Sequence, residues 1–222
     1  MSVTVITYAV IMVRWEPDAR GRLGQAAFQL FAERGFEQVT VAEIAERAGL
    51  TERTFFRYFA DKREVLFAGS AAFQDLFVSS VENAPDSAAP IDAVAAALSA
   101  QAAQFMEHPV AVRRRQVIIA AHPDLREREL IKLATVAAAV ADALRRRGVG
   151  EPAAALTAEA GMAVFRIAFE RWIAEPAGPD LDQLIRESLD ELKTVATGGA
   201  VAAVAAGATA IAGATAATAV GQ

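Results

Sequence analysis

The chain contains no cysteine and only two histidines among its 222 residues. Without thiols it can form no disulfide, no thiolate zinc site and no cysteine nucleophile, and this fits the reducing cytoplasm in which we expect it. The two histidines, His108 and His122, each precede a proline at a predicted helix break, and no carboxylate cluster at ligand spacing accompanies either. We therefore predict helix-end roles for both and no metal site.

Charge is missing from both ends of the chain. Residues 1–13 are apolar, but they lack the basic residues and the small-residue cleavage site of a secretion signal, so we expect an extension ahead of a translation start at Met12. Residues 196–222 are mostly Ala, Gly and Thr, which gain little from hydrocarbon. We predict a low-complexity tail there and no membrane partner.

Catalytic and cofactor motifs are also missing. The chain has no HExxH, P-loop, GxSxG or dinucleotide-binding fingerprint. We therefore expect neither an enzyme nor a bound cofactor.

What is present is a globular composition, with 54% hydrophobic and 22% charged residues and a net charge of −5. The charge is uneven, because residues 13–70 hold nine basic and nine acidic groups, so the whole acidic surplus lies elsewhere. This balance argues against a protein that coats nucleic acid without specificity, since phosphate attraction needs a local basic excess.

The first predicted helix carries an apolar stripe and ends at Gly35, which can adopt the left-handed C-cap conformation. The stripe consists of Leu23, Ala27, Leu30 and Phe31. A second helix begins at Thr40, where Glu43 three residues later completes a capping-box pattern. Its apolar stripe consists of Val41, Ile44, Ala45 and Ala48.

A third, short helix follows after a tight corner at Gly49. Thr51 is its predicted N-cap, and Phe55 and Phe59 at i and i+4 point inward. This arrangement predicts a helix-turn-helix, whose second helix lies in the major groove of DNA. An alternative is an amphipathic helical hairpin with solvated charges, which would make the protein a helical interaction module with a degenerate helix-turn-helix.

Side chains of the third helix suit DNA contacts. The Arg53 guanidinium can donate two hydrogen bonds to guanine, and Thr54 and Phe56 can contact thymine methyls or the backbone. Glu52 can accept from cytosine or orient Arg53. Phosphates can be held by the helix starts at Thr40 and Thr51 and by Lys62.

The segment QLFAERGFEQVTVAEIAERAGLTERTFFRYFADKREVLF closely resembles the N-terminal domain of TetR-family transcriptional regulators. The resemblance covers about residues 18–67 and implies an all-α dimeric repressor that binds a palindromic operator and is released from it by a small-molecule effector. It places the recognition-helix contacts on Thr51, Glu52, Arg53, Thr54, Phe56, Arg57, Tyr58 and Lys62. The family very often has Tyr at position 56, so a phosphate hydrogen bond is lost there, and Tyr58 can partly replace it.

The remaining chain is predicted to be helical as well. A fourth helix from about residue 61 to 83 links the two parts, and later helices are expected over residues 91–107, 110–121, 123–147, 152–174 and 181–195. The basic triplet Arg113–Arg115 is interpreted as a solvated face. The resulting domains are a helix-turn-helix domain over residues 14–60 and a helical ligand-binding and dimerisation domain over residues 61–195.

Large apolar side chains of the second domain are candidates for a cavity that binds a largely apolar effector, although each also suits an ordinary core. They are Phe73, Phe77, Phe105, Met106, Met162 and Phe165. A homodimer interface is expected from the stripes of the last two helices, as the family resemblance implies. Its predicted members are Arg166, Phe169, Trp172, Leu184 and Leu189.

Overall fold

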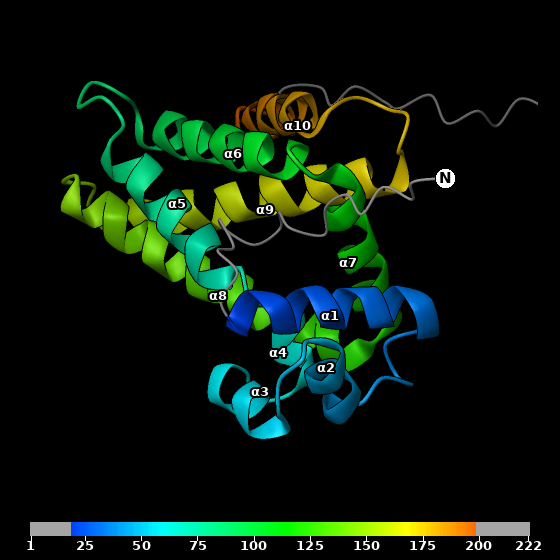
Figure 1. Cartoon of the computed structure of the whole chain (residues 1–222). Coiled ribbons are helices and arrows are strands. Elements are labelled where there is room, and N and C mark those ends of the chain that lie inside the picture. Colours follow the sequence, from blue (N-terminus) through cyan, green and yellow to red (C-terminus); the bar gives the residue numbers. More distant parts are fainter. Residues whose placement is uncertain (1–18, 199–222) are drawn as a thin grey trace, which may run out of the picture. The chain divides into compact units, whose positions relative to one another are not determined.

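The computed structural model describes residues 19–198, and within them it contains ten α-helices and no β-strand (Figure 1). The predicted all-α class is confirmed. The helices are α1 (Ala19–Arg34), α2 (Val41–Arg47), α3 (Glu52–Tyr58), α4 (Lys62–Leu66), α5 (Ser70–Glu82), α6 (Pro90–Met106), α7 (Pro109–Ala121), α8 (Pro123–Arg146), α9 (Ala153–Ala174) and α10 (Leu181–Ala196). The predicted extension, the start at Met12 and the tail from residue 199 onward lie outside the described residues.

The ends of the first two helices follow from local chemistry. Gly35 ends α1 with φ of 82°, and its N–H donates to the Phe31 carbonyl at 3.0 Å. At the start of α2, Thr40 and Glu43 form the predicted capping box in both directions.

The capping box stabilises the ionised form of the Glu43 carboxyl. The Thr40 N–H, followed by the Arg34 guanidinium and the Thr40 hydroxyl, lowers the pKa of this carboxyl to about 2 from an ordinary 4.5. Because the folded-state pKa is depressed, the cap contributes fully above pH 4.5 and is lost as the pH falls through about 2.

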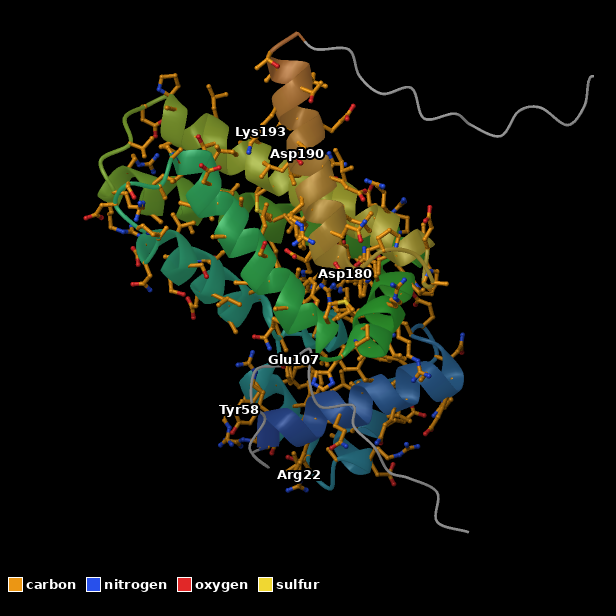
Figure 2. The ribbon with its side chains drawn as sticks, turned by 90° about the horizontal axis from the view of Figure 1, so that it is seen from above. Arg22, Tyr58, Glu107, Asp180, Asp190 and Lys193 are labelled. Carbon is orange, nitrogen blue, oxygen red and sulfur yellow. The ribbon has the colours of Figure 1, made fainter. Side chains whose placement is uncertain are left out.

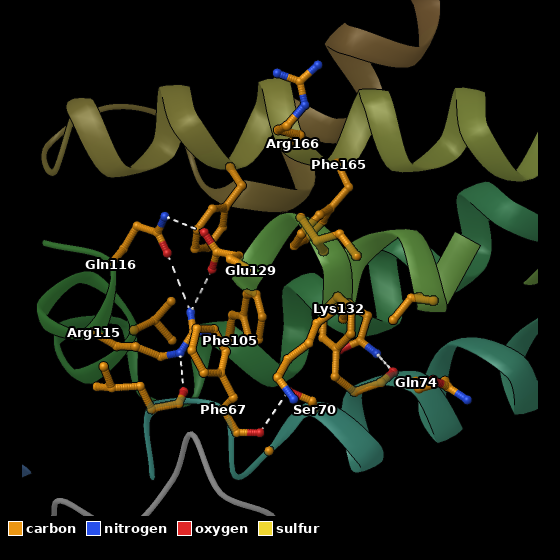
Figure 3. A pocket seen from close by; sticks show the side chains of 18 of the residues that line it. Phe67, Ser70, Gln74, Phe105, Arg115, Gln116, Glu129, Lys132, Phe165 and Arg166 are labelled. Atoms are coloured by element: carbon orange, nitrogen blue, oxygen red, sulfur yellow. Dashed lines mark hydrogen bonds and ion pairs between the residues drawn. The ribbon is translucent and has the colours of Figure 1, made fainter. Parts of the chain in front are cut away.

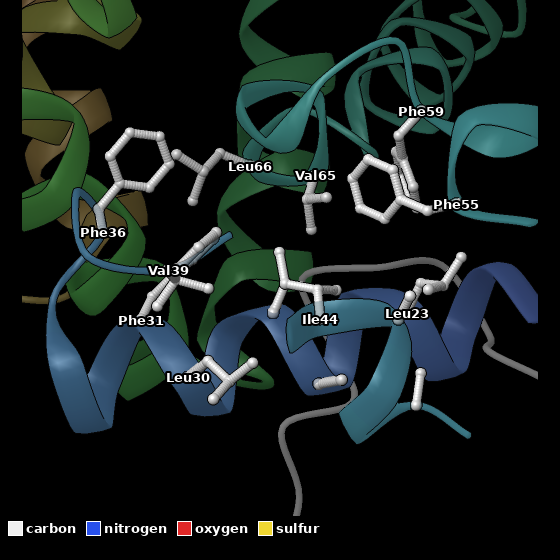
Figure 4. Packing of buried hydrophobic residues seen from close by; sticks show 14 of the residues in the cluster. Leu23, Leu30, Phe31, Phe36, Val39, Ile44, Phe55, Phe59, Val65 and Leu66 are labelled. Atoms are coloured by element: carbon white, nitrogen blue, oxygen red, sulfur yellow. The ribbon is translucent and has the colours of Figure 1, made fainter. Parts of the chain in front are cut away.

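Helices α1–α4 share one apolar core (Figure 4). Leu23, Ile44 and Phe55 are completely inaccessible to solvent in this core. Ile119 of α7 and Leu125 of α8 belong to the same cluster. The position of α3 is therefore set by a core that also includes side chains from the second half of the chain.

The predicted fourth helix over residues 61–83 is wrong in one respect, because it is broken into α4 and α5. Gly69 disfavours a continuous helix, and the Ser70 N–H bonds to the Phe67 carbonyl at 3.0 Å in a tighter turn. The Leu66 carbonyl, which a continuous helix would pair with that N–H, instead accepts from Arg115 Nε at 2.7 Å. A long-range side-chain contact thus replaces the helical bond at the break.

Helices α5, α6, α8 and α9 pack against one another, with α5 on α6 and α8, and α9 on α6 and α8. The α6–α9 approach is close at Gly161, where an added β-carbon would overlap Val94 Cγ1. The observed bounds of α6–α10 agree with the predicted ranges within about one residue. The prolines at the starts of α6, α7 and α8 explain the agreement at these three starts, because proline is favoured in the first helical turn.

Within residues 19–198 the chain divides between Leu189 and Asp190 into two compact units. The first unit contains α1–α9 and α10 as far as Leu189. Among residues 19–198 no helix combines the length and the apolar character needed to cross a bilayer.

Candidate nucleic-acid interface and internal cavity

Helix α3 is held by its apolar side and its cap. Phe55 and Phe59 are 0% and 3% exposed, and their rings lie 5.4 Å apart. The Thr51 hydroxyl accepts from the Thr54 N–H at 3.2 Å, as expected for an N-cap, and its oxygen lies 3.0 Å from the Thr54 hydroxyl oxygen. Thr54 is half-buried, and both its N–H and its hydroxyl contact Thr51 in the first turn of α3.

The outward face of α3 collects most of the predicted DNA contacts. Its exposed members are Glu52, Arg53, Phe56, Arg57 and Tyr58. Phe56 is 55% exposed, whereas the neighbouring Phe55 ring is fully buried. The Arg57 guanidinium lies 4.9 Å from the Tyr58 ring centroid and donates to its hydroxyl at 2.8 Å.

Tyr58 and Arg22 lie on the outer side of α1–α4 (Figure 2). The exposed face of α3 thus presents a guanidinium, an apolar ring and a phenol hydroxyl within two helical turns. Such groups can read base edges and contact phosphates in a major groove. The described residues contain no ion pair between Glu52 and Arg53, so the orienting role considered for Glu52 has no structural support.

Thr40 uses its hydroxyl inside the capping box. The hydroxyl donates to Glu43 Oε2 at 2.9 Å and accepts from the Glu43 N–H at 3.3 Å. A phosphate contact by this hydroxyl would compete with the cap.

In the structure Lys62 is engaged inside the protein, whereas the sequence suggested a phosphate contact. Its ammonium donates to the carbonyls of Phe36, Glu37 and Val39 at 2.9, 3.1 and 3.1 Å. It also lies 4.6 Å from the centre of the Phe36 ring. Since an ammonium has three protons, these acceptors use its full donor capacity, and Lys62 fixes the loop between α1 and α2.

Replacing Lys62 by methionine is expected to lower the free energy of unfolding by about 2–3 kcal/mol, because three carbonyls lose a charged donor. Urea denaturation measures this loss. We expect the slope of log K against log salt for DNA binding to stay the same, because the ammonium protons of Lys62 are already donated to three carbonyls. A slope reduced by about one, with stability unchanged, would restore the phosphate role.

Two arginines of α1 also hold this domain together, and the sequence pattern gave no sign of it. Arg22 Nη2 donates to the carbonyls of Ala48 and Gly49 at the end of α2. Arg20 Nη2 donates to the Ala68 carbonyl at 3.1 Å, and its guanidinium lies 5.7 Å from the Phe59 ring centroid. These contacts join residues that are distant in sequence, so periodicity could not reveal them.

A cavity of about 610 Å³ lies among α5–α9 (Figure 3). Three of the predicted pocket residues line it: Phe73, Phe105 and Phe165. The other three are corrected. Phe77 and Met162 are 0% and 7% exposed and belong to the core, whereas Met106 is 40% exposed on the surface.

Aromatic rings form a continuous wall of this cavity. The Phe73 and Phe105 rings stack at 5.9 Å, and Phe105 lies 5.7 Å from Phe169. Phe165 stacks on Phe169 at 5.5 Å. Phe169, predicted for the dimer interface, therefore lines the cavity.

Near α7 and α8 the lining of the cavity is polar, in contrast to the aromatic wall. Arg115 Nη1 pairs with Glu129 Oε1 at 3.1 Å, and Gln116 Nε2 donates to Glu129 Oε2 at 3.1 Å. Burial lowers the pKa of the Arg115 guanidinium, and the Glu129 carboxylate opposes this shift. The solvated face predicted for Arg113–Arg115 is therefore wrong at Arg115.

It is also wrong at Arg113, which packs against Trp172. The Arg113 guanidinium lies 3.9 Å from the Trp172 ring centroid and donates to the Trp172 and Ile173 carbonyls. Burial lowers the pKa of Arg113. The apolar stripe of α9 that contains Trp172 thus faces the protomer interior.

Four predicted interface residues are buried within the protomer, so they cannot form a surface between two copies. Trp172, Phe169, Leu184 and Leu189 are between 1% and 8% exposed. Arg166 is exposed and pairs with Glu170 at 3.7 Å. Periodicity identified the apolar stripe of α9 correctly, but it could not say which partner covers the stripe.

Both histidines occupy helix ends as predicted. His108 is the N-cap residue of α7, and His122 ends α7 and begins α8. His122 Nδ1 lies 2.7 Å from the Ile118 carbonyl, and its ring meets Phe36 edge-on at 5.1 Å. Within residues 19–198 no group of three or more His, Cys, Asp or Glu side chains is arranged to hold a metal ion.

Comparison with known proteins gives matches in both halves of the chain. Residues 24–68 match the model for bacterial regulatory proteins of the tetR family, and residues 88–197 match the model for the MftR C-terminal domain. TcmR, an HTH-type transcriptional regulator of Streptomyces glaucescens, is 37% identical over 81 residues, which are 36% of each chain.

A second relative is MftR of Mycobacterium tuberculosis, assigned to transcriptional regulation of mycofactocin biosynthesis. It is 28% identical over 129 residues, which are 58% of this chain and 65% of MftR. The chain thus spans about a third of TcmR and just under two thirds of MftR.

Among solved structures, SmeT, the repressor of the Stenotrophomonas maltophilia multidrug efflux pump SmeDEF, aligns with a TM-score of 0.56 and 21% identity. The alignment covers 80% of this chain and 89% of SmeT, and it concerns the fold alone. The two matched models account for the helix-turn-helix with its exposed α3 face and for the helical domain that contains the cavity. The chain belongs to the TetR family of bacterial regulatory proteins.

Proposed function

We propose that this protein is a sequence-specific transcriptional repressor that binds a palindromic operator through α3. The observation that carries the proposal is the exposed Arg53, Phe56 and Arg57 face above the buried Phe55 and Phe59. The Phe56 ring is 55% exposed, and a thymine methyl group or a sugar would cover its exposed part. Residues 14–60 are then the DNA-binding domain, and residues 61–195 bind the effector and the second subunit.

The operator is the test of this proposal. Selection from random DNA is expected to enrich an inverted repeat whose half-sites lie about one helical turn apart or slightly more. Arg53→Ala should weaken operator binding by about 1–3 kcal/mol and relax specificity at one base pair. Fluorescence anisotropy with labelled operators measures both effects.

Arg186→Ala is the matched control, because Arg186 is also an exposed arginine but lies on α10 and pairs with Asp182. It should leave operator affinity unchanged. Selection that enriches no palindrome, or equal losses in the two variants, would favour an interaction module that does not read DNA.

A palindromic operator requires two copies of the chain, so we propose a homodimer. We place its interface on an exposed apolar stripe of α9, and no longer on the buried stripe that contains Phe169 and Trp172. Leu156 and Ile167 are 66% and 47% exposed and lie three helical turns apart on the same face of α9. Exposed apolar side chains in such a row suit a self-complementary contact, and the exposed Arg166 lies beside them.

The cavity is proposed as the effector site, and its occupation is proposed to weaken operator binding. Its aromatic wall supports an apolar body for the ligand. We assign no catalysis and no cofactor to the protein. Because an operator lies on the bacterial chromosome, the proposed place of action is the cytoplasm.

A further inference from the structure

The end of the cavity beside α4 is built around Phe67. Its ring is 4% exposed and lies 5.2 Å from the Arg115 guanidinium and 5.5 Å from Lys132 Nζ. Both cations line the cavity (Figure 3). This end of the cavity therefore combines two positive charges with an aromatic ring.

The same two cations hold α4. Arg115 Nε donates to the Leu66 carbonyl at 2.7 Å, and Lys132 Nζ pairs with Glu64 Oε2 at 3.5 Å. Arg128 of α8, whose guanidinium pairs with Asp61 and Glu64 at 3.3 and 3.2 Å, adds a further link to α4. Basic side chains of α7 and α8 thus attach α4 to the second domain, in addition to the apolar contacts of Val65 and Leu66 in the shared core.

The charges that line the cavity do not balance. They comprise four basic residues and two acidic ones: Arg115, Arg126, Lys132, Arg166, Glu129 and Glu170. Glu129 is occupied by Arg115 and Gln116, and Glu170 pairs with Arg166. The partner of Lys132 is Glu64, which lies outside the lining, and Arg126 has no carboxylate partner within the described residues. Three of the four cations are thus ion-paired, and the positive surplus of the lining rests on Arg126. This surplus favours an anionic group over an ammonium group.

We propose that the cavity takes an amphipathic ligand with a carboxylate head. The carboxylate lies between Arg115 and Lys132 at the α4 end, and the apolar body lies along Phe73, Phe105 and Phe165. This assignment rests on the proposed function, because it names the chemical class of the effector for the same cavity.

Such a ligand competes with α4 for its two tethers. Its carboxylate draws Lys132 from Glu64 and Arg115 from the Leu66 carbonyl, and α4 connects directly to the recognition helix through residues 59–61. The ligand therefore prefers the state in which α4 is released. A tenfold loss of operator affinity corresponds to about 1.4 kcal/mol of this preference.

The test compares octanoate, 1-octanol and octylamine, which share one alkyl chain and differ in the head group. Isothermal titration calorimetry on the full chain is expected to give at least tenfold tighter binding of octanoate than of octanol, and no binding of octylamine. Lys132→Gln should reduce the preference for octanoate to less than threefold without changing the affinity for octanol.

Glu64→Gln supplies a readout that a merely structural role would not produce. It removes the carboxylate that competes for Lys132, so octanoate should bind at least threefold tighter while octanol binds as before. Arg145→Gln, which breaks an exposed ion-paired network away from the cavity lining, should change neither ligand.

Equal binding of octanoate and octanol, an unchanged preference in Lys132→Gln, or no binding of any of the three compounds would overturn this assignment. Operator binding by the ligand-free wild type is measured separately, and its presence would leave the DNA-binding function intact. Its absence would overturn that function whatever the calorimetry shows.

Discussion

Replacing Phe55 by alanine is expected to lower the free energy of unfolding by about 3–5 kcal/mol, because it removes a ring from the centre of the α1–α4 core. Phe55 has no solvent-accessible surface and lies 5.4 Å from the Phe59 ring. Operator binding should be lost together with stability, since Phe55 and Phe59 together anchor α3 in the core. Urea denaturation followed by circular dichroism, with anisotropy titrations on the same preparations, measures both quantities.

Phe56 provides a matched control of identical chemistry at the next position. It is 55% exposed, so Phe56→Ala should change the free energy of unfolding by less than about 0.5 kcal/mol. Its operator affinity should nevertheless fall, because the ring is proposed to meet DNA. If Phe56→Ala destabilises the fold as much as Phe55→Ala, the orientation of α3 described above is incorrect.

Replacing Trp172 by alanine should also cost about 3–5 kcal/mol of unfolding free energy. The indole is 1% exposed, and the Arg113 guanidinium lies 3.9 Å from its ring centroid. Removing it leaves a cavity and takes away the aromatic surface on which a poorly solvated cation rests. Thermal and urea unfolding of the variant should both shift strongly, whatever the protein concentration.

Ile167→Asp separates this core role from subunit contact. Ile167 is 47% exposed, so its protomer should keep a native near-ultraviolet circular dichroism spectrum. Because a two-fold interface buries the substitution twice, we expect dimer dissociation to become about 100-fold easier, or ~2.7 kcal/mol. Sedimentation equilibrium measures it. The opposite result would be a monomeric Trp172→Ala variant under native conditions and a dimeric Ile167→Asp variant. It would show that the interface lies on the buried stripe of α9.

The parts of the site that depend on neighbours in sequence were predictable. The exposed face of α3 follows from Phe55 and Phe59 at i and i+4, because a seven-residue helix that buries one side must expose the other. The cavity was predictable only in part. Phe73, Phe105 and Phe165 line it, but Phe77 of the same aromatic set is packed into the core.

Most helices and their ends were predictable from local sequence, but the break between α4 and α5 was not. The caps at these ends act on backbone groups within a few residues, so they can be predicted from the sequence. They are formed by Thr40 with Glu43, by Thr51 and by Gly35. Prolines at helix starts act in the same local way.

The packing partner of each helix face and the acceptors of each long cationic side chain depend on the tertiary structure. Lys62 reaches carbonyls more than twenty residues earlier in the chain, and Arg115 takes the Leu66 carbonyl at the break between α4 and α5. Trp172 is covered by Arg113 of the same protomer and not by a second subunit. Periodicity specifies that a stripe must be buried, but the burying partner depends on packing between distant helices, and a long cationic side chain finds its acceptors only after that packing is complete.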